Sequence, residues 1–155
     1  MKIGKILTND IEKGVLKCLS FDLDGKNILE FINKEEFVLD VKKFVEKWRL
    51  KVVRIYILVN KYLSGGNVVF LFEEKKVDED ILGDYFKLRY KYDDEKRVKI
   101  DAIVWGKRDY IGSTFLEKWD VVKVEKMVFV MKWEDFVRRR RVLYTNSKLI
   151  KVVLE

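Results

Sequence analysis

Two aspartates, Asp22 and Asp24, are separated by one residue in the segment FDLDG at residues 21–25. On a β-strand, residues i and i+2 point to the same face, so the two carboxylates would lie side by side. Ionised carboxylates repel each other unless water or a cation separates them, and Mg²⁺ and Mn²⁺ prefer oxygen ligands of this kind. The spacing fits a divalent-metal site, and a plain hairpin turn, of which Asp24-Gly25 is typical, is the alternative that this segment alone leaves open.

Two later segments carry residues that fit the same chemistry. Successive glycines in residues 62–67 would let backbone N–H groups approach a phosphate, and the expected contacts are Ser64, Gly65, Gly66 and Asn67. A loop that only turns the chain is the alternative. Asp101 interrupts the strongly β-forming run at residues 98–104. Because an unpaired buried carboxylate is costly, Asp101 either faces solvent or has a partner.

The order and spacing of these three segments resemble the archaeo-eukaryotic primase superfamily, which includes primase small subunits and the primase-polymerases of archaeal plasmids and viruses. The resemblance spans about residues 19–113. It implies an RRM-like or primase-like core in which Asp22, Asp24 and Asp101 are catalytic and hold Mg²⁺ or Mn²⁺. The activity it implies is that of a metal-dependent nucleotidyltransferase in DNA replication. It also implies that Lys107 and Arg108 belong to a basic segment that guides nucleic acid.

The chain contains no histidine. This excludes Ser-His and Cys-His catalysis, His-based zinc sites and a histidine-pair relaxase. The primase family's second motif normally carries a histidine that contacts the incoming nucleotide, and here Asn67 and residues 68–70 occupy that region. The alternative function is therefore a non-catalytic DNA- or RNA-binding protein of an archaeal virus or its host, and the sequence leaves open whether the chain is an enzyme.

Two other enzyme classes match less of the sequence. Residues 21–25 also resemble the first motif of haloacid-dehalogenase-type phosphatases, with Asp22 as the nucleophile. That family requires Thr or Ser on a later strand, and the strand predicted at residues 51–59 ends in Asn60-Lys61. Residues 73–75 (EEK) resemble the Glu-x-Lys of metal-dependent, restriction-type nucleases, but the preceding predicted strand lacks the Asp that such a site needs.

The charge balance favours a polyanionic partner. The chain has 33 Lys plus Arg and 26 Asp plus Glu, a net charge of +7, and a basic surface attracts DNA or RNA. The densest cationic run is predicted to lie on a helix at residues 134–144 and to contact phosphates; it consists of Arg138, Arg139, Arg140 and Arg141. A solvated helix face with ion pairs to Glu134 and Asp135 is the alternative.

Aromatic residues between cations are a second nucleic-acid feature. Tyr90 and Tyr92 alternate with Lys and Arg in a strand predicted at residues 87–92. Exposed aromatics beside cations suit base stacking, whereas half-buried core tyrosines are the alternative.

The elements expected to position these residues form a single α+β domain over residues 1–155, with a mainly antiparallel central sheet and helices packed on it. The clearest helix is 34–48, because apolar residues recur from Phe37 at i+4, i+7, i+8 and i+11. Asn33 is expected to cap its N-terminus, together with Glu36 in a capping-box arrangement. Helices are also predicted at 78–86 and 134–144. Strands are predicted at 2–7, 15–23, 28–32, 51–59, 68–73, 87–92, 97–105, 121–131 and 148–154.

Composition also indicates the cellular compartment in which the protein is expected. A single cysteine, Cys18, excludes an intrachain disulfide, and no stretch is apolar enough for a signal peptide or a membrane span. We therefore expect a cytoplasmic protein without a membrane partner, in the host cytoplasm if the chain is viral. The absence of Gln and the abundance of Lys, Glu and Ile are typical of a hyperthermophile. The oligomeric state is unknown from sequence.

Overall fold

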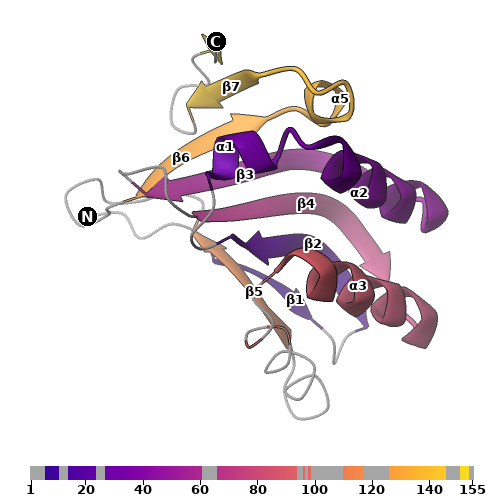
Figure 1. The fold of residues 1–155 in the computed structure, drawn as a ribbon. Coiled ribbons are helices and arrows are strands. Elements are labelled where there is room, and N and C mark those ends of the chain that lie inside the picture. The colour runs from indigo at the N-terminus through magenta and orange to yellow at the C-terminus, as the bar shows by residue number, and fades with distance from the viewer. Residues whose placement is uncertain are drawn as a thin grey trace.

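The computed structural model describes residues 6–10, 14–23, 27–60, 66–93, 96, 98, 110–116, 126–145 and 151–153. Within them, strands form one antiparallel sheet in the order β5-β1-β2-β4-β3-β6-β7-β8, with helices on one face (Figure 1). The strands are β1 (Ile6–Asp10), β2 (Val15–Asp22), β3 (Val52–Asn60), β4 (Gly66–Lys76), β5 (Tyr110–Leu116), β6 (Lys126–Met131), β7 (Val142–Thr145) and β8 (Lys151–Val153). The helices are α1 (Ile28–Phe31), α2 (Glu35–Lys47), α3 (Glu79–Tyr92) and α5 (Trp133–Val137). The predicted α+β class is confirmed.

The main core lies between the helices and the sheet. The apolar stripe predicted for α2 is confirmed, since Phe37, Val41, Phe44 and Val45 are buried and Trp48 packs against the core. Aromatic rings meet edge to face at its centre, with ring centroids 5.2 Å apart for Phe21 and Phe37 and 5.0 Å apart for Phe37 and Tyr92. Such contacts add to the hydrophobic burial that fixes the helices on the sheet.

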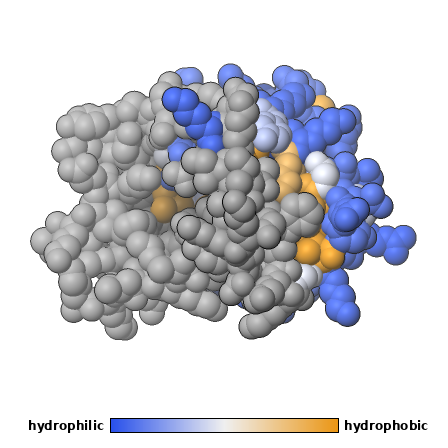
Figure 2. Space-filling view, turned by 90° about the horizontal axis from the view of Figure 1, so that it is seen from below, coloured by the Kyte–Doolittle hydropathy of each residue, from blue (hydrophilic) through white to orange (hydrophobic). Residues whose placement is uncertain are grey.

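The opposite face of the sheet also buries apolar side chains. The pairing of β2 with β4 shifts register between Leu16 and Cys18, and the β2 residues that point to each face change at this irregularity. After it, Leu19 and Phe21 join the helix-side core, while Cys18 packs with a smaller group formed by Tyr56, Leu58, Val69 and Val130. The described surface seen from below is mostly hydrophilic, with a narrow apolar strip (Figure 2). In the described part of the chain, no helix has the length and apolar character needed to cross a membrane.

Residues 28–32 do not form the predicted strand, so they do not pair with β2 as a hairpin. The segment contains α1, and the Asn27 side chain accepts a hydrogen bond from the Glu30 backbone N–H at 3.2 Å. A short apolar run fits a buried helix as well as a strand, so the capping hydrogen bond of Asn27 decides between the two. The predicted Asn33 cap of α2 is also wrong, because Lys34 holds that position and makes no side-chain cap bond.

Residues 87–92 are helical and not a strand, because α3 continues to Tyr92. The helix begins at Asp78, whose side chain accepts from the Ile81 backbone N–H at 2.9 Å. Its buried residues recur at helical spacing: Ile81, Leu82, Tyr85, Leu88, Arg89 and Tyr92. The alternating Tyr and Lys residues near its C-terminal end also fit a helix, because an amphipathic helix buries one face and leaves the residues of the other face in solvent.

Other predicted elements are confirmed in part. Strands 15–23, 51–59 and 68–73 correspond to β2, β3 and β4, although β4 begins earlier and includes Gly66 and Asn67, which were predicted to turn. The predicted strand at 97–105 lies outside the described residues except residue 98, which is not in a strand. The described parts of 2–7, 121–131 and 148–154 lie in β1, β6 and β8.

Candidate functional site

Two of the three segments that carry predicted site residues meet at one end of the sheet. Asp22, the last residue of β2, lies directly opposite Asn67 of β4, and Asn67 in turn pairs with Leu58 of β3. The Leu23 backbone N–H donates to the Gly66 carbonyl at 2.8 Å. Asp22 and Asn67 are both half-buried. The other residues predicted for the metal, phosphate-binding and basic sites lie outside the described residues: Asp24, Ser64, Gly65, Asp101, Lys107 and Arg108.

Asp93 supports this strand end, and sequence reasoning missed it. Its Oδ1 accepts a hydrogen bond from the Asp22 backbone N–H at 3.0 Å, and its Oδ2 accepts from Arg89 Nε at 2.9 Å. The Arg89 and Asp93 side chains have zero exposure. The Asp22 backbone N–H thus bonds to the side chain of a residue 71 positions further along the chain, while its strand partner on β4 is Asn67. The i,i+4 spacing of Arg89 and Asp93 would indicate this pair once residues 79–92 are recognised as a helix.

Gly66 has a structural role that differs from the predicted one. A Cβ at this position would lie 1.8 Å from the Leu58 carbonyl oxygen of β3. Glycine is therefore required for β3 and β4 to approach each other beside Asn67, whatever the adjoining loop binds.

The four arginines after α5 form a turn, and the predicted helix over residues 134–144 is wrong beyond Val137. Arg139 has a positive φ of 55°, and the Arg140 backbone N–H donates to the Asp135 carbonyl at 2.8 Å. The helix ends because this left-handed residue reverses the chain toward β7. We call residues 138–141 the arginine turn. All four of its side chains are exposed.

The arginine turn is tied to the start of α2. Arg139 Nε donates to the Asn33 carbonyl at 2.8 Å, and Arg140 Nη1 lies 3.8 Å from Asp135 Oδ1. Among the residues that the structure describes, Arg138 and Arg141 have no carboxylate partner. The predicted ion pairs with the acidic residues of the helix thus engage at most one of the four guanidinium groups.

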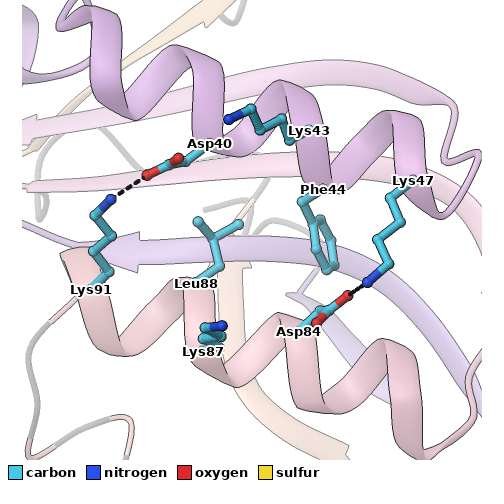
Figure 3. Close-up of a pocket in the computed structure, with 8 residues that line it drawn as sticks. All are labelled: Asp40, Lys43, Phe44, Lys47, Asp84, Lys87, Leu88 and Lys91. Atoms are coloured by element: carbon cyan, nitrogen blue, oxygen red, sulfur yellow. Dashed lines mark hydrogen bonds and ion pairs between the residues drawn. The ribbon is translucent and has the colours of Figure 1, made fainter.

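A groove of about 270 Å³ lies between α2 and α3 (Figure 3). We call it the lysine groove. From α2 it is lined by Asp40, Lys43, Phe44 and Lys47, and from α3 by Asp84, Lys87, Leu88 and Lys91. Ion pairs join the two helices, with 2.7 Å between Asp40 and Lys91 and 2.7 Å between Lys47 and Asp84. Sequence reasoning missed this site because three of its eight residues, Lys87, Leu88 and Lys91, fell in the wrongly predicted strand.

Both carboxyls of the groove are held in the ionised form. Burial opposes ionisation of Asp40, but hydrogen bonds from Lys91 and Tyr92 outweigh it and lower its pKa below the usual value. The hydrogen bond from Lys47, with a further one from Trp48 Nε1 at 2.9 Å, lowers the pKa of Asp84. Asp40 and Asp84 therefore remain partners of the lysines at neutral pH.

The predicted stacking face of tyrosines is wrong. Tyr92 is buried and its hydroxyl donates to Asp40, while Tyr90 on the same helix is exposed. Tyr85 is fully buried, with the Arg89 guanidinium 5.7 Å from its ring centroid. Tyr85 and Tyr92 therefore belong to the core, as the alternative of core tyrosines expected, and they do not share an exposed face with Tyr90.

Burial disfavours the reactive form of the one cysteine, Cys18. Burial raises the pKa of the Cys18 thiol to about 12, and the charges of Arg89 and Lys17 offset only part of this effect. The reactive thiolate is therefore scarce.

Metal ligation has limited support in the described part of the chain. No group of three or more His, Cys, Asp or Glu residues there is arranged to hold a metal ion. The strand end supplies the Asp22 carboxylate and the Asn67 amide as neighbouring oxygen-bearing side chains. No protein-family model, curated protein or solved structure matches this chain.

Proposed function

We propose that this chain binds nucleic acid and that the arginine turn contacts the phosphate backbone. The observation that carries the proposal is a set of four exposed guanidinium groups on a turn whose backbone is fixed by hydrogen bonds. Arginine presents a planar fork of donors that matches phosphate oxygens, and a fixed backbone reduces the entropy lost on binding. Arg138 and Arg141 have no carboxylate partner in the described part of the chain, so their charges are available to phosphates.

Replacing Arg138 and Arg141 together with Ala is expected to weaken binding to DNA or RNA and to flatten its salt dependence. Each lost phosphate contact removes about 0.7 to 0.9 from the slope of log affinity against log salt. Fluorescence anisotropy with single- and double-stranded DNA and RNA, between about 50 and 200 mM salt, measures both quantities.

The matched control removes the same charge elsewhere. Lys75 and Lys76 lie near the end of β4, and the double Ala variant changes the net charge equally. This control should bind nearly as well as the unmodified chain. Equal losses in both double variants would mean that net charge alone drives binding, and no binding at low salt to any of the four probes would refute the proposal.

A second candidate function is a divalent-metal-dependent nucleotidyltransferase with a primase-like core. The observation that favours it is the cross-strand pairing of Asp22 with Asn67, which brings the first predicted motif beside the second. Carboxylate and amide oxygens suit Mg²⁺ or Mn²⁺, and Asp24 and Asp101 are the further ligands expected from sequence. The ion would supply charge neutralisation at phosphate oxygens.

In this second candidate, Mn²⁺ or Mg²⁺ is expected to raise the thermal midpoint of the unmodified chain but not that of Asp22→Asn. At an ion concentration about 100 times Kd, stabilisation is about 2.7 kcal/mol, which corresponds to several degrees. Asp80→Asn, an exposed carboxyl on α3, is the control and should keep the response. An equal metal response in Asp22→Asn, or none in the unmodified chain, would rule out the site, and nucleic-acid affinity would then stand on the arginine turn alone.

A further inference from the structure

The lysine groove is built from one pattern that occurs twice, 44 residues apart. On each helix an Asp is followed by Lys at i+3, an apolar residue at i+4 and Lys at i+7. These positions share one helix face. The helices run in opposite directions, so the Asp of each meets the last Lys of the other (Figure 3). The groove therefore has an approximate two-fold axis between Phe44 and Leu88.

This symmetry leaves one lysine of each helix without a counter-charge. In the part of the chain described by the structure, neither Lys43 nor Lys87 has a carboxylate within ion-pair distance. Each lies near the Asp of its own helix, but that Asp is hydrogen-bonded to a lysine of the opposite helix. The eight lining residues comprise four lysines and two aspartates, which sum to +2, and Glu36 at the rim pairs with Lys91 at 2.7 Å. The positive charge that remains is that of Lys43 and Lys87.

We propose that the lysine groove binds a mononucleotide, with its phosphate between Lys43 and Lys87 and its base or sugar against Phe44 and Leu88. A phosphate monoester carries about −1.5 to −2 charges at neutral pH, which complements the net charge of the groove. The largely buried side chains of Phe44 and Leu88 form an apolar floor that a base or sugar can contact at its exposed edge. A volume of about 270 Å³ is at the small end for ligand sites, which suits one nucleotide. The site is separate from the arginine turn and does not depend on it.

Titration calorimetry at low salt with AMP, adenosine and inorganic phosphate tests the proposal. AMP should bind more tightly than either fragment, because it alone engages both the lysines and the apolar floor. Lys43→Met and Lys87→Met keep an apolar side chain but lose the ammonium. Each should weaken AMP binding about tenfold or more, since a hydrogen bond to a charged group contributes enough for that change. The two losses should be similar, because the phosphate lies near the two-fold axis.

Lys42→Met is the control, because Lys42 lies on α2 but pairs with Glu46 at 3.8 Å outside the groove. It should bind AMP as the unmodified chain does. The proposal is overturned if AMP does not bind at millimolar concentration, if Lys42→Met weakens binding as much as the groove variants, or if Lys43→Met and Lys87→Met bind normally. Thermal unfolding should show both groove variants folded, with midpoints close to that of the unmodified chain, because neither ammonium forms an ion pair within the described part of the chain.

Two further measurements separate this site from the proposed function. The Arg138→Ala, Arg141→Ala double variant should bind AMP like the unmodified chain even though it binds nucleic acid weakly. A single-stranded oligonucleotide should be bound equally by Lys43→Met and the unmodified chain. If that variant loses oligonucleotide affinity and free AMP does not bind, the groove takes a nucleotide within a strand, and the mononucleotide proposal is wrong.

Discussion

Replacing Asp93 with Ala is expected to lower the free energy of unfolding by about 3–5 kcal/mol, as found when one member of a buried ion pair is removed. The Arg89 guanidinium has zero exposure, and the variant would remove its ion pair with Asp93 at 2.8 Å while the charge stays buried. The Asp22 backbone N–H would also lose its acceptor. Denaturant titration of the variant and the unmodified chain measures the difference.

Two controls separate the charge from the hydrogen bond. Asp93→Asn keeps an oxygen that can accept from the Asp22 N–H but lacks the negative charge, so its loss should be smaller than that of Asp93→Ala. Glu73→Gln removes one member of an exposed pair, which is 3.2 Å from Lys51, and should change stability by about 0–1 kcal/mol. A loss of that small size for Asp93→Ala would show that the Arg89–Asp93 pair does not support the strand end.

Replacing Gly66 with Ala is expected to lower the free energy of unfolding by about 3 kcal/mol or more, because the added atom overlaps rigid backbone. The new Cβ would lie 1.8 Å from the Leu58 carbonyl oxygen and 2.9 Å from its carbon, so β3 and β4 must separate. Thermal and denaturant unfolding both measure the loss. If Gly66 served only to let a phosphate approach, Gly66→Ala would fold normally and lose only ligand affinity.

Gly83→Ala is the matched control. Gly83 lies within α3 and a Cβ there would meet nothing within 4 Å. Its substitution should stabilise the protein by about 0.5–1 kcal/mol, because alanine loses less backbone entropy in a helix. If Gly66→Ala lowers the free energy of unfolding and Gly83→Ala raises it, the close contact between β3 and β4, and not the loss of a glycine as such, controls stability at Gly66.

Local patterns in the sequence determined much of the framework. The apolar stripe from Phe37 to Trp48 identified α2 with nearly correct bounds, and apolar runs identified β2, β3 and β4. These succeeded because a long periodic run is satisfied by one kind of element. Residues 28–31 and 87–92 failed for the opposite reason: both patterns fit a strand or a helix, and the decision depends on caps and on burial against other elements.

The candidate sites divide in the same way. Composition and sequence alone determined that the chain is basic, lacks histidine and concentrates charge at residues 138–141. Asp22 was identified from its spacing, but its position opposite Asn67 follows from placing β4 between β2 and β3, which no local pattern encodes. No local pattern encodes the role of Asp93 either, because that role depends on the burial of its ion-pair partner Arg89 against β2.

The lysine groove shows most directly what a local sequence pattern cannot determine. Its repeated pattern is readable in the sequence, 44 residues apart. A pattern on one helix, however, specifies only which residues share a face of that helix. Whether two such faces meet, and in which relative direction, is set by how α2 and α3 pack on the sheet. Only the tertiary structure therefore decided that four of the groove's charges neutralise one another while Lys43 and Lys87 keep theirs.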